Sequence, residues 1–172
     1  MITLIIGGSG SGKSAYAEKL VKKISENNRV YIATMRVWDH ESEIRVARHR
    51  AQRNELGFET IECPINLSGI QISQDATVLL EDIPNLVANE MFDENGDVRC
   101  IIPGLRKLEG SCKNLVMVTG NVFADGKDYD VETQKYMRLL SEVNAAAAEL
   151  ADCGVEVVYT IPVPFKGELP CV

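Results

Sequence analysis

Short apolar runs rich in β-branched residues recur along the chain, each bounded by turn residues. They predict buried strands over residues 2–6, 30–34, 77–80, 115–119 and 155–161. The intervening segments combine helical spacing with polar faces and predict helices over residues 13–27, 39–55, 83–92, 102–110 and 131–152. This alternation favours an α/β fold with a mainly parallel central sheet and helices on both of its faces. Residues 93–100 and 120–130, rich in Gly, Asp and Asn, predict surface loops.

The composition narrows the classes of protein to which the chain can belong. Its 172 residues fit a single domain, 1–172, and its 45% hydrophobic content is that of a globular protein. A net charge of −7 argues against nucleic acid as a partner. We see no apolar run long enough to span a membrane and no signal peptide, so we expect a cytoplasmic protein. The scattered cysteines argue against a structural zinc site and fit a reducing compartment: they are Cys63, Cys100, Cys112, Cys153 and Cys171.

The segment after the first predicted strand carries the most specific motif in the chain. It satisfies G-x-x-x-x-G-K-S/T, with a strand before it and a helix after it, and consists of Gly7, Gly8, Ser9, Gly10, Ser11, Gly12, Lys13 and Ser14. In such a loop, backbone N–H groups and the helix N-terminus hold the phosphates of a nucleotide. We expect Lys13 to reach the β- and γ-phosphates and Ser14 to bind Mg²⁺. The motif and the alternation together predict a P-loop NTPase-like (RecA-like) three-layer fold.

A second metal ligand is expected at the end of another strand, where Glu81 and Asp82 follow an apolar run. Successive strand residues face opposite ways, so only one of the two can easily point at the metal. The other can cap the helix predicted over 83–92. We favour Glu81 as the catalytic and metal-binding carboxylate, and Thr34, which ends the second strand, as a further nucleotide-binding candidate.

Both histidines of the chain, His40 and His49, fall in the helix predicted over 39–55. There Arg45, His49 and Arg53 recur at intervals of four and form one ridge. The two guanidinium groups would lower the pKa of the imidazole between them and keep it nucleophilic, and they would bind a phosphoryl group. Spacing alone nevertheless favours a solvated, salt-bridged helix face over a catalytic one.

Taken together, these residues resemble the bifunctional adenosylcobinamide kinase / adenosylcobinamide-phosphate guanylyltransferase family. The resemblance runs over most of the chain and rests on the phosphate loop, the strand Tyr31-Ile32-Ala33-Thr34, the set Asp39, Glu41, Arg45 and His49, the segments Leu79-Leu80-Glu81 and Leu86-Val87-x-Asn89-x-x-Phe92, and Val143-Asn144.

The resemblance reverses the reading of His49, because the matching histidine in that family is the guanylylated nucleophile. It implies that His49 takes GMP from GTP and passes it to adenosylcobinamide phosphate. It also implies a kinase step that phosphorylates adenosylcobinamide with ATP or GTP. The expected partners are therefore a corrinoid and a nucleotide with Mg²⁺, and the expected assembly is a homotrimer. No guanine-reading N-K-x-D motif identifies the kinase donor.

One segment departs from the family pattern. The family usually reads T-N-E-V-G after the fourth strand, whereas here Thr119 is followed by residues 120–126, with a carboxylate and an amide missing from their usual places. This loop lies at the carboxyl edge of the sheet, where α/β proteins bind ligands. We therefore expect that the altered loop changes or removes either corrinoid binding or one of the two activities. The alternatives are a P-loop small-molecule kinase without a covalent intermediate and a non-catalytic nucleotide-binding member.

Overall fold

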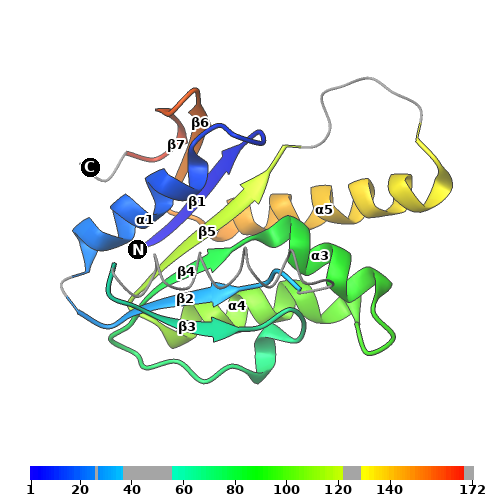
Figure 1. Cartoon of the computed structure of the whole chain (residues 1–172), viewed down its shortest axis with the longest axis horizontal. Coiled ribbons are helices and arrows are strands. Elements are labelled where there is room, and N and C mark those ends of the chain that lie inside the picture. The colour runs from blue at the N-terminus through cyan, green and yellow to red at the C-terminus, as the bar shows by residue number, and fades with distance from the viewer. Residues whose placement is uncertain (26, 37–55, 122–128, 169–172) are drawn as a thin grey trace.

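The fold was analysed in a computed structural model, which describes residues 1–25, 27–36, 56–121 and 129–168. Within these residues the chain forms a seven-stranded sheet of order β3-β2-β4-β5-β1-β6-β7 (Figure 1). The strands are β1 (Ile2–Gly7), β2 (Arg29–Ala33), β3 (Phe58–Glu62), β4 (Thr77–Glu81), β5 (Asn114–Gly120), β6 (Cys153–Val158) and β7 (Ile161–Lys166). Neighbouring strands are parallel except β7, which pairs antiparallel with β6. The mainly parallel sheet predicted from the sequence is confirmed.

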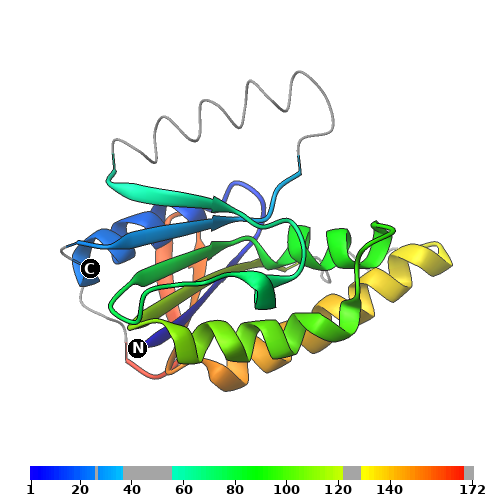
Figure 2. The same cartoon turned by 90° about the horizontal axis from the view of Figure 1, so that it is seen from below.

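Helices cover both faces of the sheet, because its central strands are apolar on both sides. The main helices are α1 (Lys13–Ile24), α3 (Ile83–Phe92), α4 (Ile101–Ser111) and α5 (Val131–Leu150), with short 3-10 turns at Leu67–Gly69 and Val98–Cys100. One core cluster joins α1 to the sheet through Ala17, Leu20 and Val21. A second, larger cluster joins α3, α4 and α5 to the opposite face through residues such as Leu86, Leu105 and Leu140. Figure 2 shows the sheet between these two layers.

Most predicted elements are confirmed with small shifts of their ends. The helix predicted over 83–92 has those bounds in the structure, whereas the one predicted over 13–27 ends at Ile24, where Ser25 adopts an extended conformation. The prediction for 93–100 is confirmed as turns, with a single 3-10 turn at its end. The helix predicted over 39–55 and most of the loop 120–126 lie outside the described residues.

The sequence did not predict strand β3, and it misplaced the end of the last predicted strand. Strand β3 lies at the sheet edge and carries two glutamates and a threonine, so its apolar pattern is weak. The strand predicted over 155–161 is wrong at its end, because the chain turns back at Tyr159 and Thr160, both in the left-handed region. The following residues, predicted to be extended or irregular, form β7.

Strand β7 tolerates Pro162 and Pro164 because it is an edge strand. The two residues of the turn leave Val158 and Ile161 as the first pair of the hairpin, and Pro162 lies opposite Val157. In a two-residue hairpin the first pair exchanges hydrogen bonds, so residues 162 and 164 direct their backbone groups outward. Because proline has no N–H, these positions offer no hydrogen-bond donor at the outer edge of the sheet. Pairing of another strand with β7 is therefore disfavoured.

Candidate functional site

The phosphate loop lies between β1 and α1, at the carboxyl edge of the sheet. Gly10 and Gly12 adopt φ values of 71° and 90°, which only glycine takes without strain. Gly12 caps α1 without a side-chain hydrogen bond, and the first turn of the helix holds no acidic residue. The N–H groups and the positive end of α1 thus face the loop without a carboxylate of that turn in competition, which suits a bound phosphate.

Lys13, Ser14 and Glu81 are brought together at this edge. The Lys13 ammonium donates to the Gly8 carbonyl, at an Nζ–O distance of 3.3 Å, and so lies folded over the loop. The Ser14 hydroxyl donates to Oε1 of Glu81, the last residue of β4. Two residues that are 67 positions apart in the sequence therefore meet beside the phosphate loop.

The Glu81 carboxyl has the character of a metal ligand. Burial raises its pKa above the ordinary glutamate value, while hydrogen bonds from the Ser14 and Tyr31 hydroxyls offset part of that rise and the nearby Asp82 adds to it. Its Oε2 atom is buried and has no hydrogen-bond partner among the described residues. A buried oxygen without a partner, next to a hydroxyl, fits a hard cation such as Mg²⁺, which prefers oxygen ligands.

Asp82 has the other role that the sequence allowed for one of the two acids. Its carboxylate accepts from the Asn85 N–H at 2.9 Å and caps α3. Burial raises the pKa of the Asp82 carboxyl, partly offset by the cap and by the charge of Lys13. The expectation that one acid of the pair caps this helix is confirmed.

Thr34 lies at the same edge, but its side chain serves the backbone. It is fully buried, and its hydroxyl both donates to the Asp82 carbonyl and accepts from the Asp82 N–H, each at 2.8 Å. Its hydroxyl is thus committed to holding the end of β2 against the end of β4. Thr34 therefore links the ends of β2 and β4 beside the site, and its part in nucleotide binding stays a prediction.

Asn89, on α3, bridges the ends of two strands. Its amide donates to the Thr34 carbonyl at 2.7 Å and to the Pro64 carbonyl at 3.0 Å, just beyond β2 and β3 respectively. Close by, Arg36 forms a salt bridge with Asp93, which caps the C-terminus of α3. These contacts fix residues 34–36, from which the chain continues into the segment that carries His49.

The other flank of the phosphate loop rests on the β6–β7 hairpin. The Thr160 N–H donates to the Ser11 carbonyl at 2.8 Å. A Cβ atom at Gly7 would come within 2.8 Å of the Val157 carbonyl oxygen, and one at Gly12 within 2.9 Å of the Thr160 methyl group. The absence of a side chain at both glycines therefore permits this close approach of the hairpin to the loop.

The sequence predicted part of this arrangement. It identified the phosphate loop, Lys13, Ser14 and Glu81, which the structure places together. Arg45, His49 and Arg53 lie outside the described residues. The contact between Thr160 and Ser11 was missed, because no Gly or Asn marks the turn. The bridging role of Asn89 was missed too, although an amide within an apolar helix could have signalled a buried hydrogen bond.

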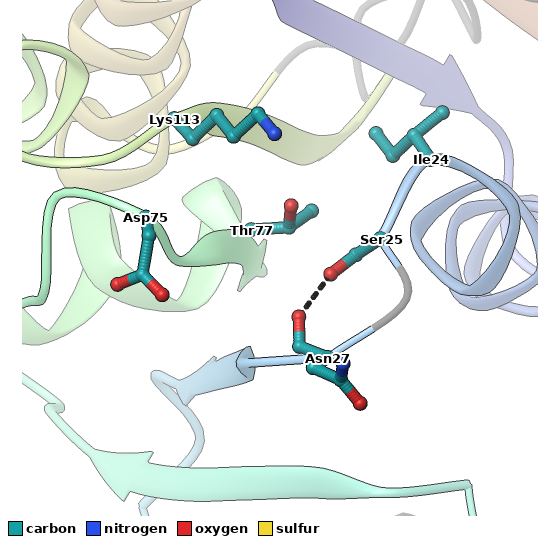
Figure 3. Close-up of a pocket in the computed structure, with 6 residues that line it drawn as sticks. All are labelled: Ile24, Ser25, Asn27, Asp75, Thr77 and Lys113. Carbon is teal, nitrogen blue, oxygen red and sulfur yellow. Dashed lines mark hydrogen bonds between the residues drawn. The ribbon is translucent and has the colours of Figure 1, made fainter.

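A separate cavity lies at the opposite, amino edge of the sheet (Figure 3). It has a volume of about 380 Å³ and is lined by Ile24, Ser25, Asn27, Asp75, Thr77 and Lys113. Thr77 opens β4 and Ile24 closes α1, so this cavity lies at the far end of the strands from the phosphate loop. It belongs to a different region from the site described above.

Comparison with known proteins identifies the family. Residues 3–165 match the family described as cobinamide kinase / cobinamide phosphate guanyltransferase. The chain belongs to this family. It is 37% identical over 100 residues to the bifunctional adenosylcobalamin biosynthesis protein CobU of Escherichia coli, a match that covers 56% of this chain and about half, 54%, of that protein. It is 27% identical to the corresponding CobP of Pseudomonas aeruginosa over 98% of this chain and 99% of that protein.

Solved structures with little sequence similarity share the fold. The flagellar accessory protein FlaH from Methanocaldococcus jannaschii matches with a TM-score of 0.51 and 11% identity, over 96% of this chain and 78% of that one. A Pyrococcus horikoshii protein, PH0250, matches with a TM-score of 0.51 and 9% identity, over 96% of this chain and 86% of that one. The predicted P-loop NTPase-like, RecA-like α/β fold is confirmed. None of the described helices is both long and apolar enough to cross a membrane.

Proposed function

We propose that this chain phosphorylates adenosylcobinamide with ATP or GTP, and transfers GMP from GTP through His49 to adenosylcobinamide phosphate. The observation that carries the proposal is the phosphate loop with Lys13, Ser14 and Glu81 assembled beside it, in a chain of the cobinamide kinase / guanyltransferase family. Family membership supports both activities, and the assembled groups support binding of a nucleoside triphosphate.

In the kinase step, the loop N–H groups and Lys13 hold the phosphates of the donor. The substrate hydroxyl oxygen attacks the γ-phosphorus, the bond to the bridging oxygen breaks, and the hydroxyl proton leaves to a base. Ser14 and Glu81 would hold Mg²⁺, which supplies neutralisation of the charge that develops on the phosphate oxygens. Thr34 and Asp82 keep the strand end that bears Glu81 in place.

In the guanylyl step, a neutral imidazole nitrogen of His49 attacks the α-phosphorus of GTP. A nitrogen–phosphorus bond forms, the bond between the α-phosphorus and the bridging oxygen breaks, and pyrophosphate leaves. A phosphate oxygen of adenosylcobinamide phosphate then attacks the same phosphorus and releases the imidazole. Arg45 and Arg53 are proposed to stabilise the charge that develops during both transfers.

Labelling with GTP that carries radioactive phosphorus in the α-position tests the guanylyl step. We expect covalent label that is labile in acid and stable in alkali. The label should disappear in His49→Ala and persist in His40→Ala, which changes the only other histidine of the chain. Absence of label on the wild type, or equal label on His49→Ala, refutes the covalent intermediate. Phosphorylation of adenosylcobinamide without label would instead identify a P-loop kinase of the direct-transfer type.

The homotrimer implied by the resemblance is also a proposal, and strand β7 offers a surface for it. Ile161, Val163 and Phe165 alternate along one face of this strand and remain 63%, 46% and 51% exposed. Because the prolines blunt the edge, copies would associate through these side chains and not by pairing of strands. Light scattering after size exclusion should show a trimer for the wild type and a smaller species for Ile161→Glu.

A further inference from the structure

We propose that Tyr159, at the tip of the β6–β7 hairpin, is the surface on which the base of the bound nucleotide stacks. The proposal rests on the proposed function only in that the phosphate loop holds the phosphates. It adds the part of the site that binds the nucleoside, and it predicts a site that accepts both guanine and adenine.

The hairpin tip is fastened directly to the phosphate loop. The Thr160 N–H donates to the Ser11 carbonyl at 2.8 Å, and the Thr160 methyl group touches Gly12. Tyr159 precedes Thr160, so its Cα lies about 3.8 Å from that of Thr160. The backbone of Tyr159 is thus held next to the loop through the contacts of Thr160.

The strand order decides which end of the nucleotide lies near this turn. Ser14 and Glu81 would hold Mg²⁺ on the γ-phosphate side of a bound triphosphate, because the ion neutralises charge at the transferred end. Glu81 ends β4, which lies on the β5 side of β1, whereas the hairpin lies on the β6 side. The γ-phosphate end therefore points toward β4, and the α-phosphate with its nucleoside extends toward the hairpin.

The turn has a backbone conformation that its two residues, Tyr159 and Thr160, adopt unfavourably. Tyr159 and Thr160 have φ values of 47° and 68°, a region that β-branched residues such as threonine rarely occupy. A two-residue hairpin of this kind is formed most easily by Asn-Gly. Strain that a better turn sequence would relieve is typical of functional positions. The tyrosine is also 88% exposed, so one face of its ring is open to a ligand.

Aromatic stacking suits a site without a base-specific motif. Every base has a π-face, so a tyrosine ring binds guanine and adenine alike. This agrees with a chain that uses a nucleoside triphosphate but has no guanine-reading N-K-x-D sequence. Selectivity for GTP in the guanylyl step would then arise elsewhere.

The test compares Tyr159→Asn and Tyr159→Phe with the wild type, with Mg²⁺ and three probes: GTP, ATP and inorganic tripolyphosphate. Asparagine favours the left-handed region, so Tyr159→Asn should melt at no lower temperature than the wild type. We expect it to bind GTP and ATP roughly 10-fold more weakly, the range for loss of one stacked base, and to bind tripolyphosphate unchanged. Tyr159→Phe should bind all three as the wild type does.

Three results would overturn the stacking role alone. The first is unchanged GTP and ATP affinity in Tyr159→Asn. The second is an equal loss for tripolyphosphate, which would mean that the turn acts through the shape of the phosphate loop. The third is a smaller oligomer of Tyr159→Asn in light scattering, which would replace stacking by a role in subunit contact. A wild type that binds neither tripolyphosphate nor nucleotide would instead refute the proposed function itself.

Discussion

Replacing Asn89 by alanine tests whether the bridge between two strand ends positions the segment that carries His49. The amide makes two hydrogen bonds, of 2.7 Å to the Thr34 carbonyl and 3.0 Å to the Pro64 carbonyl. Alanine removes both donors and leaves the Thr34 carbonyl, in a fully buried residue, without them. The end of β2 then loses the hydrogen bond from Asn89 of α3, while the bonds of Thr34 to Glu81 and Asp82 at the end of β4 remain.

The magnitude follows from these two bonds. Each contributes about 1 kcal/mol net, and an unsatisfied buried carbonyl adds about 1–3 kcal/mol. The free energy of unfolding should therefore fall by about 3–5 kcal/mol, which is less than the total stability of most domains, about 5–15 kcal/mol. Asn89→Asp should lose more, because a carboxylate would face two carbonyl oxygens and donate to neither.

The assay combines urea unfolding with covalent labelling by α-labelled GTP and binding of Mg²⁺-tripolyphosphate. We expect the labelling rate of Asn89→Ala to fall by about 10- to 100-fold, since small misplacement of reacting groups has effects of that size. Tripolyphosphate binding should stay within about twofold, because the two hydrogen bonds of the Asn89 amide do not involve the phosphate loop. Gln74→Ala, which removes an exposed amide in a turn, serves as the control. Equal losses in labelling and tripolyphosphate binding, or an unchanged unfolding free energy, refute the positioning role.

Three further outcomes follow from the site. Glu81→Gln should abolish Mg²⁺-dependent turnover yet raise the urea midpoint at pH 7, by on the order of 1 kcal/mol in unfolding free energy, because it removes a buried charge. Since burial raises the pKa of Glu81 in the folded state, the wild type should gain stability as pH falls from that raised pKa to the unfolded value. Below this pH range, the wild type and Glu81→Gln should have the same free energy of unfolding, because the Glu81 carboxyl is then protonated. Binding of Mg²⁺ to the wild type should weaken as the pH falls through the same range. Gly7→Ala should destabilise the fold by about 1–3 kcal/mol, because its Cβ would lie 2.5 Å from Ser11 Oγ and 2.8 Å from the Val157 carbonyl. Gly8→Ala, whose Cβ meets none of the described residues within 4 Å, should leave the urea midpoint close to that of the wild type.

The sequence predicted those parts of the molecule that local pattern determines. Central strands such as β5 are apolar on both faces and stand out as continuous runs. The phosphate loop follows from Gly12, Lys13 and Ser14 together, since that combination requires a strand before it and a helix after it. Strand alternation predicted that Glu81 and Asp82 point in opposite directions, so that one acid could bind the metal while the other capped a helix. The structure shows Asp82 as the cap of α3.

Contacts between distant segments were not predictable in this way. Asn89 reads in the sequence as one polar position in an apolar helix, and only the packing of α3 against the sheet shows that its amide reaches Thr34 and Pro64. The edge strand β3 lacked a signal because its side chains are partly polar and because, among the described strands, it has a neighbour on one side only.

The β6–β7 hairpin shows why a departure from local rules carries information. Tyr159 and Thr160 fit an extended strand by propensity, and the sequence accordingly predicts a strand through residue 161. The turn forms there because Pro162 and Pro164 suit only the edge of a sheet and because Thr160 is held by the carbonyl of Ser11. The contact with the phosphate loop thus stabilises a conformation that the turn residues themselves disfavour. A turn that forms against the propensity of its own residues and bonds to the phosphate loop is typical of a functional position, which agrees with the role proposed for the exposed Tyr159.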